Sequence, residues 1–211
     1  MTNVPTTLST VVDPSRIDDD TDGRTLRRKR NRDAVIASLI SLIEEGDLDP
    51  TVAKIADRAA VSHRSIFRYF DDLDDLARTA IETAVRDALP LAIIPGVGEG
   101  SLDHRIEGMV ASRLRILRRT KQLIRVAHGK ATALPEIDRS LSNVAEMTCD
   151  QFHRHFAVEL SEMDPAEAEH LVAALGSQLG FEGYDFQSRM LSRTDEEIAD
   201  SWRVLLRRVL R

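Results

Sequence analysis

Several features that would indicate other classes of protein are scarce or absent in this sequence of 211 residues. Cys149 is the only cysteine, which excludes an intrachain disulfide and any zinc site built from several cysteines. No apolar run approaches the roughly 18 residues that a membrane-spanning helix needs, and the N-terminus lacks the basic-then-apolar order of a signal peptide. We therefore expect a cytoplasmic protein without a membrane segment.

Aromatic residues make up only 4% of the chain, whereas hydrophobic residues make up 42% and charged residues 30%. The last two values are typical of a soluble globular protein. No stretch alternates apolar and polar residues as a half-buried strand would, and the apolar spacing is helical throughout. The sequence thus predicts an all-α fold of about nine helices.

Charge is distributed unevenly along the chain. The net charge of -6 divides into -4 for residues 1–23, +4 for residues 24–70 and -6 for residues 71–211. Residues 1–23 mix Thr, Ser, Pro and Asp without apolar periodicity, which predicts a disordered acidic arm. The positive charge is concentrated in residues 24–70, where it favours association with phosphate through release of counterions.

The segment from Thr51 to Phe70 contains two short helical patterns separated by a turn. Its apolar positions, which can pack the two helices together, are Val52, Ile55, Ala56, Val61, Ile66 and Phe70. Ser62 is placed to cap the second helix, because its hydroxyl can accept a hydrogen bond from a backbone N–H in the first turn. Two such helices in succession indicate a helix-turn-helix that reads DNA.

We predict that the polar positions of this motif, together with two upstream arginines, contact DNA. The upstream pair is Arg27 and Arg30, one turn apart in a basic run at the start of an amphipathic helix, although a run of charges is more often a solvated face. The predicted contacts within the motif are Thr51, Ser62, His63, Arg64, Ser65, Phe67, Arg68 and Tyr69.

The motif resembles the DNA-binding domain of the TetR family of bacterial repressors. The resemblance covers residues 24–80 and rests on Ile55-Ala56, Val61-Ser62, the run Phe67-Arg68-Tyr69-Phe70, and Leu76. Three positions depart from the family pattern, which usually has Gly at Ala60, Tyr at Phe67 and Lys at Leu73. An alanine in a left-handed turn would cost about 1 kcal/mol, and the other two changes remove expected phosphate contacts.

Beyond the motif the sequence predicts a larger helical part at residues 71–211, attached to a DNA-binding domain at residues 24–70. Helices are expected from near Asp72 to Leu89, from Ser101 to Leu117, and over a shorter piece from Lys121 to His128. Three more are expected from Pro135 to about Leu160, from Asp164-Pro165 to Leu179, and from a cap at Thr194 to Val209.

The resemblance implies a homodimer formed by the last two of these helices, presenting two reading heads to a pseudo-palindromic operator on double-stranded DNA. Small residues that would allow close helix approach are Ala173, Ala174, Gly176, Ser177 and Gly180, although ordinary packing within one chain explains them equally well. The resemblance to the family also implies an effector pocket in the larger part. The candidates for its lining are Met109, Arg113, Met147, Phe152, Phe156, Phe181 and Tyr184. These residues are more often plain core.

Catalytic and metal chemistry lack the motifs that they need. Cys149 and His153 are spaced as a possible metal pair, but no third ligand is evident, and a packed cysteine is the more frequent explanation. No nucleophile elbow, phosphate loop or paired-carboxylate motif is present. We expect no enzyme activity, no metal and no cofactor.

We therefore expect a dimeric transcriptional regulator, more specifically a repressor that a small-molecule effector releases from its operator by shifting the fourth helix. The alternative is a helical protein-interaction or adaptor module in which the helix-turn-helix pattern serves packing only.

Overall fold

The computed structural model describes residues 15–211, and side chains from residue 23 onward. Within this part of the chain every regular element is helical, as the sequence predicted. The elements are α1 (Ser15–Glu44), α2 (Val52–Arg58), α3 (His63–Tyr69), α4 (Leu73–Ala88), the 3-10 turn η1 (Leu89–Ala92), α5 (Leu102–Ala131), α6 (Pro135–His155), α7 (Ala157–Leu160), α8 (Pro165–Gln178), α9 (Phe181–Asp185), the π-helical segment η2 (Phe186–Met190) and α10 (Asp195–Val209).

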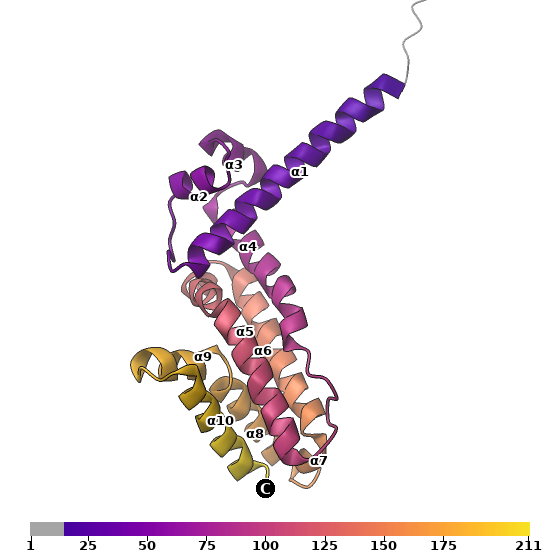
Figure 1. Cartoon of the computed structure of the whole chain (residues 1–211), viewed down its shortest axis with the longest axis vertical. Helices are drawn as coiled ribbons and strands as arrows, with labels where there is room; N and C mark the ends of the chain where they lie inside the picture. Colours follow the sequence, from indigo (N-terminus) through magenta and orange to yellow (C-terminus); the bar gives the residue numbers. More distant parts are fainter. Residues whose placement is uncertain (1–14) are drawn as a thin grey trace, which may run out of the picture.

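The molecule is elongated, with α2 and α3 at one end and the long helices below them (Figure 1). We call residues 24–70 the head and residues 71–211 the bundle. The first half of α1 projects away from both (Figure 1).

The start of α1 corrects one expectation. The helix already includes residues 15–23, so the predicted disordered arm is wrong for that segment, and residues 1–14 of the arm lie outside the described residues. Composition suggested a boundary at Arg24, but extending an existing helix adds one hydrogen bond for each residue fixed. No proline interrupts the chain between Ser15 and the end of α1.

The head has its own apolar core. The second half of α1 contributes Val35, Ile36, Leu39 and Ile43, all at most 5% exposed, as the helical spacing predicted. Gly46 ends this helix: it has φ +101°, and its N–H donates to the Ile43 carbonyl at 2.9 Å. Two residues from other elements, Ile55 of α2 and Ile66 of α3, complete the centre of this core.

The long helices of the bundle differ from the prediction in one place. Helix α5 runs without interruption from Leu102 to Ala131, so the expected separate piece from Lys121 to His128 does not exist. The sequence between Leu117 and Lys121 is polar but has no proline or glycine, and a polar turn on an exposed side does not end a helix. The Ser101 hydroxyl caps α5 by accepting from the His104 N–H at 3.3 Å.

The last helices begin where their caps predicted. Asp164 caps α8, and a capping box joins Thr194 and Glu197 at the start of α10, with the Glu197 carboxylate accepting from the Thr194 N–H at 2.8 Å. Residues 135–160 divide at Phe156 into α6 and α7, and no local pattern indicated α9 or η2. The ten α-helices of residues 15–211 therefore exceed the expected nine by one.

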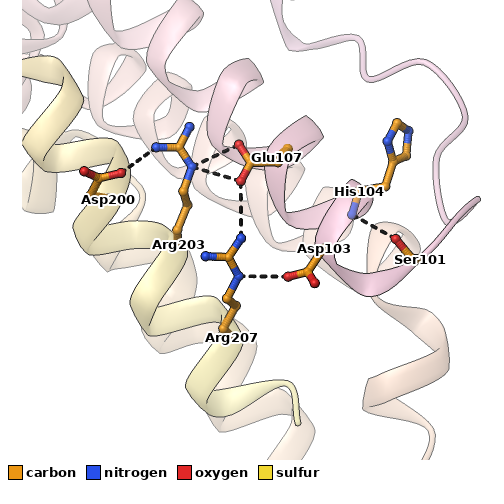
Figure 2. A network of polar contacts seen from close by, with 7 residues as sticks. All are labelled: Ser101, Asp103, His104, Glu107, Asp200, Arg203 and Arg207. Carbon is orange, nitrogen blue, oxygen red and sulfur yellow. Dashed lines mark hydrogen bonds and ion pairs between the residues drawn. The ribbon is translucent and has the colours of Figure 1, made fainter.

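Helix α10 packs against α5 through both apolar and charged contacts. Trp202 is 1% exposed, and its indole N–H donates to the Gln178 carbonyl at 3.0 Å. On the outside, the Arg203 guanidinium lies 2.9 Å from Glu107, and the Arg207 guanidinium lies 2.8 Å from Asp103 (Figure 2). The apolar contacts provide most of the attachment, because exposed ion pairs contribute little.

Candidate DNA-binding head and effector cavity

Helix α3 has one buried face and one open face. Ile66 is fully buried, while His63, Arg64, Phe67 and Arg68 point into solvent. The helix begins as predicted, with the Ser62 hydroxyl accepting from the Ser65 N–H at 3.2 Å. This arrangement holds polar and cationic side chains outward on a short helix, as recognition of a DNA groove requires.

The turn before α3 adopts the left-handed conformation that was expected at Ala60. Ala60 has φ +52°, and the following N–H of Val61 donates to the Ala56 carbonyl at 3.0 Å. This is the hydrogen bond that closes a left-handed helix end. Alanine therefore occupies a position where glycine would be relaxed.

Tyr69 joins α3 to α1. Its hydroxyl accepts a hydrogen bond from Asn31 at 3.4 Å and one from Arg68 at 3.0 Å. Burial alone would raise the pKa of Tyr69, but these two hydrogen bonds and the charges of Arg68 and Arg28 lower it overall. The lowered pKa reports a positive electrostatic potential on this side of the head.

The basic side chains of the head fall into two groups. Lys54 lies 2.6 Å from Asp47, and Arg58 lies 2.5 Å from Glu45, so two acidic residues near the α1–α2 turn neutralise them. Arg27 and Arg30 of α1 are exposed, and within the described part of the chain they form no ion pair. The charges left for an external anion are thus on α1 and α3.

All ten residues predicted to contact DNA lie in the head. Arg27 and Arg30 are on α1, Thr51 caps α2 by accepting from the Lys54 N–H, and the others cap or form α3. Ser65 and Tyr69 are half-buried, and the remaining eight are exposed.

Two of the positions that depart from the family pattern are also open to solvent: Phe67 is 52% exposed and Leu73 is 40% exposed. Contact with DNA itself remains a prediction.

The bundle contains a cavity of about 920 Å³, open to solvent on one side, between α4, α5, α6 and the α8–α9 junction. Its walls are mainly aliphatic, including Ile81 and Val85 of α4 and Ile116 and Leu123 of α5. This size and character are typical of a site for a small organic molecule.

Three of the seven predicted effector residues line this cavity: Arg113, Met147 and Phe181. The other four, Met109, Phe152, Phe156 and Tyr184, do not; they are at most 1% exposed in the bundle core, and the prediction that they line the cavity is wrong. Helical periodicity identifies the buried face of a helix, but it cannot tell which buried side chains border a void.

Two contributions to the cavity, those of α4 and of Cys149, were not predicted from the sequence. Cys149 lines the cavity from α6, and burial is the main cause that raises the pKa of its thiol. No residue of the cavity lining in α4 belongs to a recognisable motif, so only the fold brings α4 to this place. Within the described residues no group of three His, Cys, Asp or Glu side chains could hold a metal ion.

Arg113 is the charged residue buried in the cavity wall. Its Nε donates to the Leu179 carbonyl at 3.0 Å, and its Nη1 donates to the Thr148 hydroxyl at 3.3 Å. Burial lowers the pKa of the Arg113 guanidinium to about 10, so it remains protonated at neutral pH. The cavity therefore contains a fixed positive charge.

The cavity and the head share structural elements. Leu123 of α5 lines the cavity and also belongs to the apolar core of the head. Helix α4 places Leu76 and Ala80 in that core, and the adjacent Ile81 in the cavity wall. A ligand that moves these walls would therefore act directly on the support of α2 and α3.

The small residues of α8 and of the turn after it differ in their surroundings. A Cβ atom at Gly180 would lie 2.5 Å from the Gly176 carbonyl, so packing within the chain requires glycine there, whereas one at Gly176 would lie 3.2 Å from the Cys149 sulfur, a tight contact. Ala173, Ala174 and Ser177 are exposed.

The described part of the chain contains no helix with the length and apolar character that a membrane span needs.

Comparison with known proteins agrees with this arrangement. Residues 35–80 match the family model described as bacterial regulatory proteins, tetR family. This segment comprises the end of α1, all of α2 and α3, and the first half of α4. The matched family is one of regulatory proteins, not of enzymes. No curated protein matches the chain.

Solved structures extend the likeness to most of the chain. A transcriptional regulator from Rhodococcus sp. Rha1 superposes with a TM-score of 0.68 at 18% identity, over 85% of this chain and 95% of that one. A protein assigned to the TetR family, from Rhodococcus sp., gives 0.61 at 15% identity over 87% and 100%. The multidrug binding protein EbrR, in complex with imidazole, gives 0.59 at 20% identity over 87% and 89%. The chain thus has the fold of TetR-family regulators.

Proposed function

We propose that this chain, which carries the DNA-binding domain of the TetR family of bacterial regulatory proteins at residues 35–80, is a ligand-responsive transcriptional repressor. It binds a pseudo-palindromic operator as a homodimer, and a small-molecule effector in the bundle releases it. The protein acts in the cytoplasm.

One observation carries the DNA-binding part of this proposal. The open face of α3 and the exposed basic residues of α1 belong to the same head and are joined by the hydrogen bond from Asn31 to Tyr69. In this arrangement α3 enters the major groove, where Arg64 and Ser65 read bases. Arg27 and Arg30 contact phosphates and fix the position of the head on the duplex.

The exposed face of α8 supports the homodimer. Ala173, Ala174 and Ser177 present short side chains over one stretch of this helix, and Val204 of α10 is 68% exposed. Short side chains allow the helices of two chains to approach closely. A two-fold axis through α8 and α10 then relates the two heads to the two half-sites of an operator.

The cavity supports the response to a ligand. It borders α4 and Leu123, which also contact the head core, so an occupant that displaces α4 changes the separation of the two α3 helices. Two half-sites one helical turn of DNA apart tolerate little change in that separation. EbrR, which has a similar fold, is a multidrug binding protein.

The test is the dependence of DNA affinity on salt concentration. A fluorescently labelled genomic fragment is titrated with wild-type protein, with Arg27→Ala and with Arg30→Ala, at several salt concentrations. Each substitution is expected to reduce the slope of log K against log salt by about 0.9 for every phosphate that the variant no longer neutralises. Arg139→Ala is the matched control, because Arg139 is an exposed arginine of α6, outside the head.

The alternative function is a helical interaction module that does not bind a specific DNA sequence. It predicts weak binding to every genomic fragment and no difference between the head variants and Arg139→Ala. That result would refute the regulator proposal.

A further inference from the structure

The strongest unexplained feature of the bundle is the absence of a carboxylate partner for Arg113. Two arginines in the described part of the chain are buried, Arg105 and Arg113, each 6% exposed. Arg105 is paired with Glu159, which is also largely buried. Arg113 forms no ion pair with any described residue, and its two hydrogen bonds go to neutral oxygens.

A buried arginine without a counter-charge is costly unless an anion reaches it. The guanidinium has five N–H donors, and two of the Arg113 donors are used by Leu179 and Thr148. Arg113 is part of the cavity wall, so its remaining donors are available to a ligand there. The other charged residues of the lining, His128, Asp150, Arg154 and Glu182, are exposed. Glu182 acts on Arg113 only through space, without an ion pair, so Arg113 is the buried charge that a ligand deep in the cavity meets.

The rest of the lining restricts the ligand further. Apart from Phe181 and His128, whose rings stack at 5.2 Å, the apolar lining side chains are aliphatic or small. Such walls accept a flexible aliphatic body. One buried positive charge neutralises a monoanion, whereas a phosphate dianion would keep an uncompensated charge in apolar surroundings. The planar guanidinium also matches the geometry of a carboxylate.

We propose that the effector is an aliphatic monocarboxylic acid whose carboxylate accepts hydrogen bonds from Arg113 and whose chain lies between α4, α5 and α6. This assignment of the ligand class rests on the proposed function of the cavity as an effector site. It makes Arg113 the residue that distinguishes acids from neutral molecules of the same length.

The first experiment compares three probes with the same alkyl chain by calorimetry: decanoate, decanol and decyltrimethylammonium. Wild-type protein is expected to bind decanoate at least about 10-fold more tightly than decanol, because hydrogen bonds to charged groups are the stronger ones. It is expected not to bind the ammonium probe. Equal affinity for decanoate and decanol would overturn the proposal.

Two variants locate the charge that matters. Arg113→Met keeps an unbranched apolar side chain and is expected to bind decanoate and decanol equally. Arg154→Met, which removes an exposed arginine at the rim of the same cavity, is expected to keep the preference for decanoate. A preference that survives in Arg113→Met or disappears in Arg154→Met would overturn the assignment.

A further measurement needs no variant. Cys149 is the only cysteine and lines the cavity, so its rate of alkylation by a maleimide reports occupancy. A chain that lies between α4, α5 and α6 covers the sulfur, so decanoate at about 100 times its Kd is expected to slow the reaction roughly 100-fold. An unchanged rate at saturation would place decanoate outside the cavity and overturn the proposal.

Failure of the ligand class and failure of the regulator function can be distinguished. If wild-type protein binds operator DNA but does not prefer decanoate to decanol, the proposal of a monocarboxylic acid as effector is wrong. If it binds decanoate through Arg113 and no DNA fragment shows salt-dependent binding, the ligand class stands and the repressor function is wrong.

Discussion

At the scale of single residues, Ala60 holds a backbone conformation that its side chain disfavours. Its φ of +52° lies in the left-handed region, where an L-residue other than glycine costs about 1 kcal/mol. The turn tolerates this cost because Ile55, Ala56 and Ile66 on both sides are buried in the head core. The strain is local to the connection between α2 and α3.

Replacement of Ala60 by glycine is therefore expected to stabilise the protein. Ala60→Gly should raise the free energy of unfolding by up to about 0.5 kcal/mol, since relief of about 1 kcal/mol of strain is partly offset by the extra entropy of glycine in the unfolded chain. Urea denaturation followed by circular dichroism measures the change. The neighbouring Ala59 has φ -77°, so Ala59→Gly should destabilise the protein instead. Stabilisation by both variants would contradict this explanation.

His155 makes stability depend on pH. The ring is 2% exposed; Nδ1 accepts from the Gly98 N–H at 3.3 Å, and Nε2 donates to the Arg105 carbonyl at 2.8 Å, which requires the neutral form. Burial is the main cause that lowers the pKa of His155 below 6.5, with the Arg105 charge adding to it and Glu159 opposing it. Because the unfolded chain binds the proton more readily, stability is lost as the pH falls below about 6.5.

His155→Gln should make the stability less dependent on pH in this range. Urea denaturation of the wild type and the variant between pH 7.5 and pH 5 measures the effect. His170→Gln, at an exposed position, should retain the wild-type profile. An identical slope in all three proteins would mean that His155 does not titrate differently on folding.

At the scale of single elements, the start of α4 lacks the positive charge that the resemblance implies there. Leu73 is the first residue of this helix and is 40% exposed beside α3, at the position where the resemblance implies a lysine. A cation at this position neutralises one more phosphate. Helix α1 supplies Arg27 and Arg30 as the alternative source of charge.

Leu73→Lys is expected to strengthen operator binding and to steepen its dependence on salt. Neutralising one more phosphate changes the slope of log K against log salt by about -0.9. Anisotropy titrations of labelled DNA at several salt concentrations measure the slope. Val158→Lys is a matched control, because Val158 is 57% exposed in α7, outside the head. A similar gain in both variants would indicate only a general effect of charge.

At the scale of the whole molecule, the two parts of the chain are joined by more than the link through α4. Glu44 of α1 forms an ion pair with Arg119 of α5, and Asp74 of α4 lies 2.8 Å from Lys130 of α5. Together with Leu123, the ion pair of Glu44 attaches the head to the C-terminal half of α5, and the ion pair of Asp74 holds the start of α4 against the same half. The walls of the cavity and the head are therefore attached to the same helices, α4 and α5.

The homodimer can be tested on the exposed face of α8. Ala174→Arg places a long charged side chain where two copies of the helix would approach, and it should convert the dimer to a monomer that binds half-sites weakly. Light scattering after size exclusion measures the mass. Val158→Arg, at a position of α7 that is 57% exposed, should leave the mass unchanged. Dissociation by Val158→Arg alone would move the interface away from α8.

Local patterns in the sequence were sufficient to predict the helix-turn-helix, the caps and the buried stripe of α1. Ser62, Asp164 and Thr194 cap the helices that they were expected to cap, because a cap depends on atoms within one turn. The left-handed turn at Ala60 was predicted from resemblance. The uninterrupted length of α5 was not predicted, because its polar turn suggests a break although no proline or glycine is present there. The presence of η2 was not predicted either, because no local pattern indicates it.

By itself, therefore, the sequence determined the helical character, the place of the recognition helix and the concentration of positive charge in the head. Only the tertiary structure decided which buried residues border the cavity and that α4 forms part of its wall. It alone also showed that Arg113 has no carboxylate partner among the described residues, whereas Arg105 is paired with Glu159. The physical reason is that helical hydrogen bonds and caps are local, whereas voids and ion pairs depend on segments far apart in the chain.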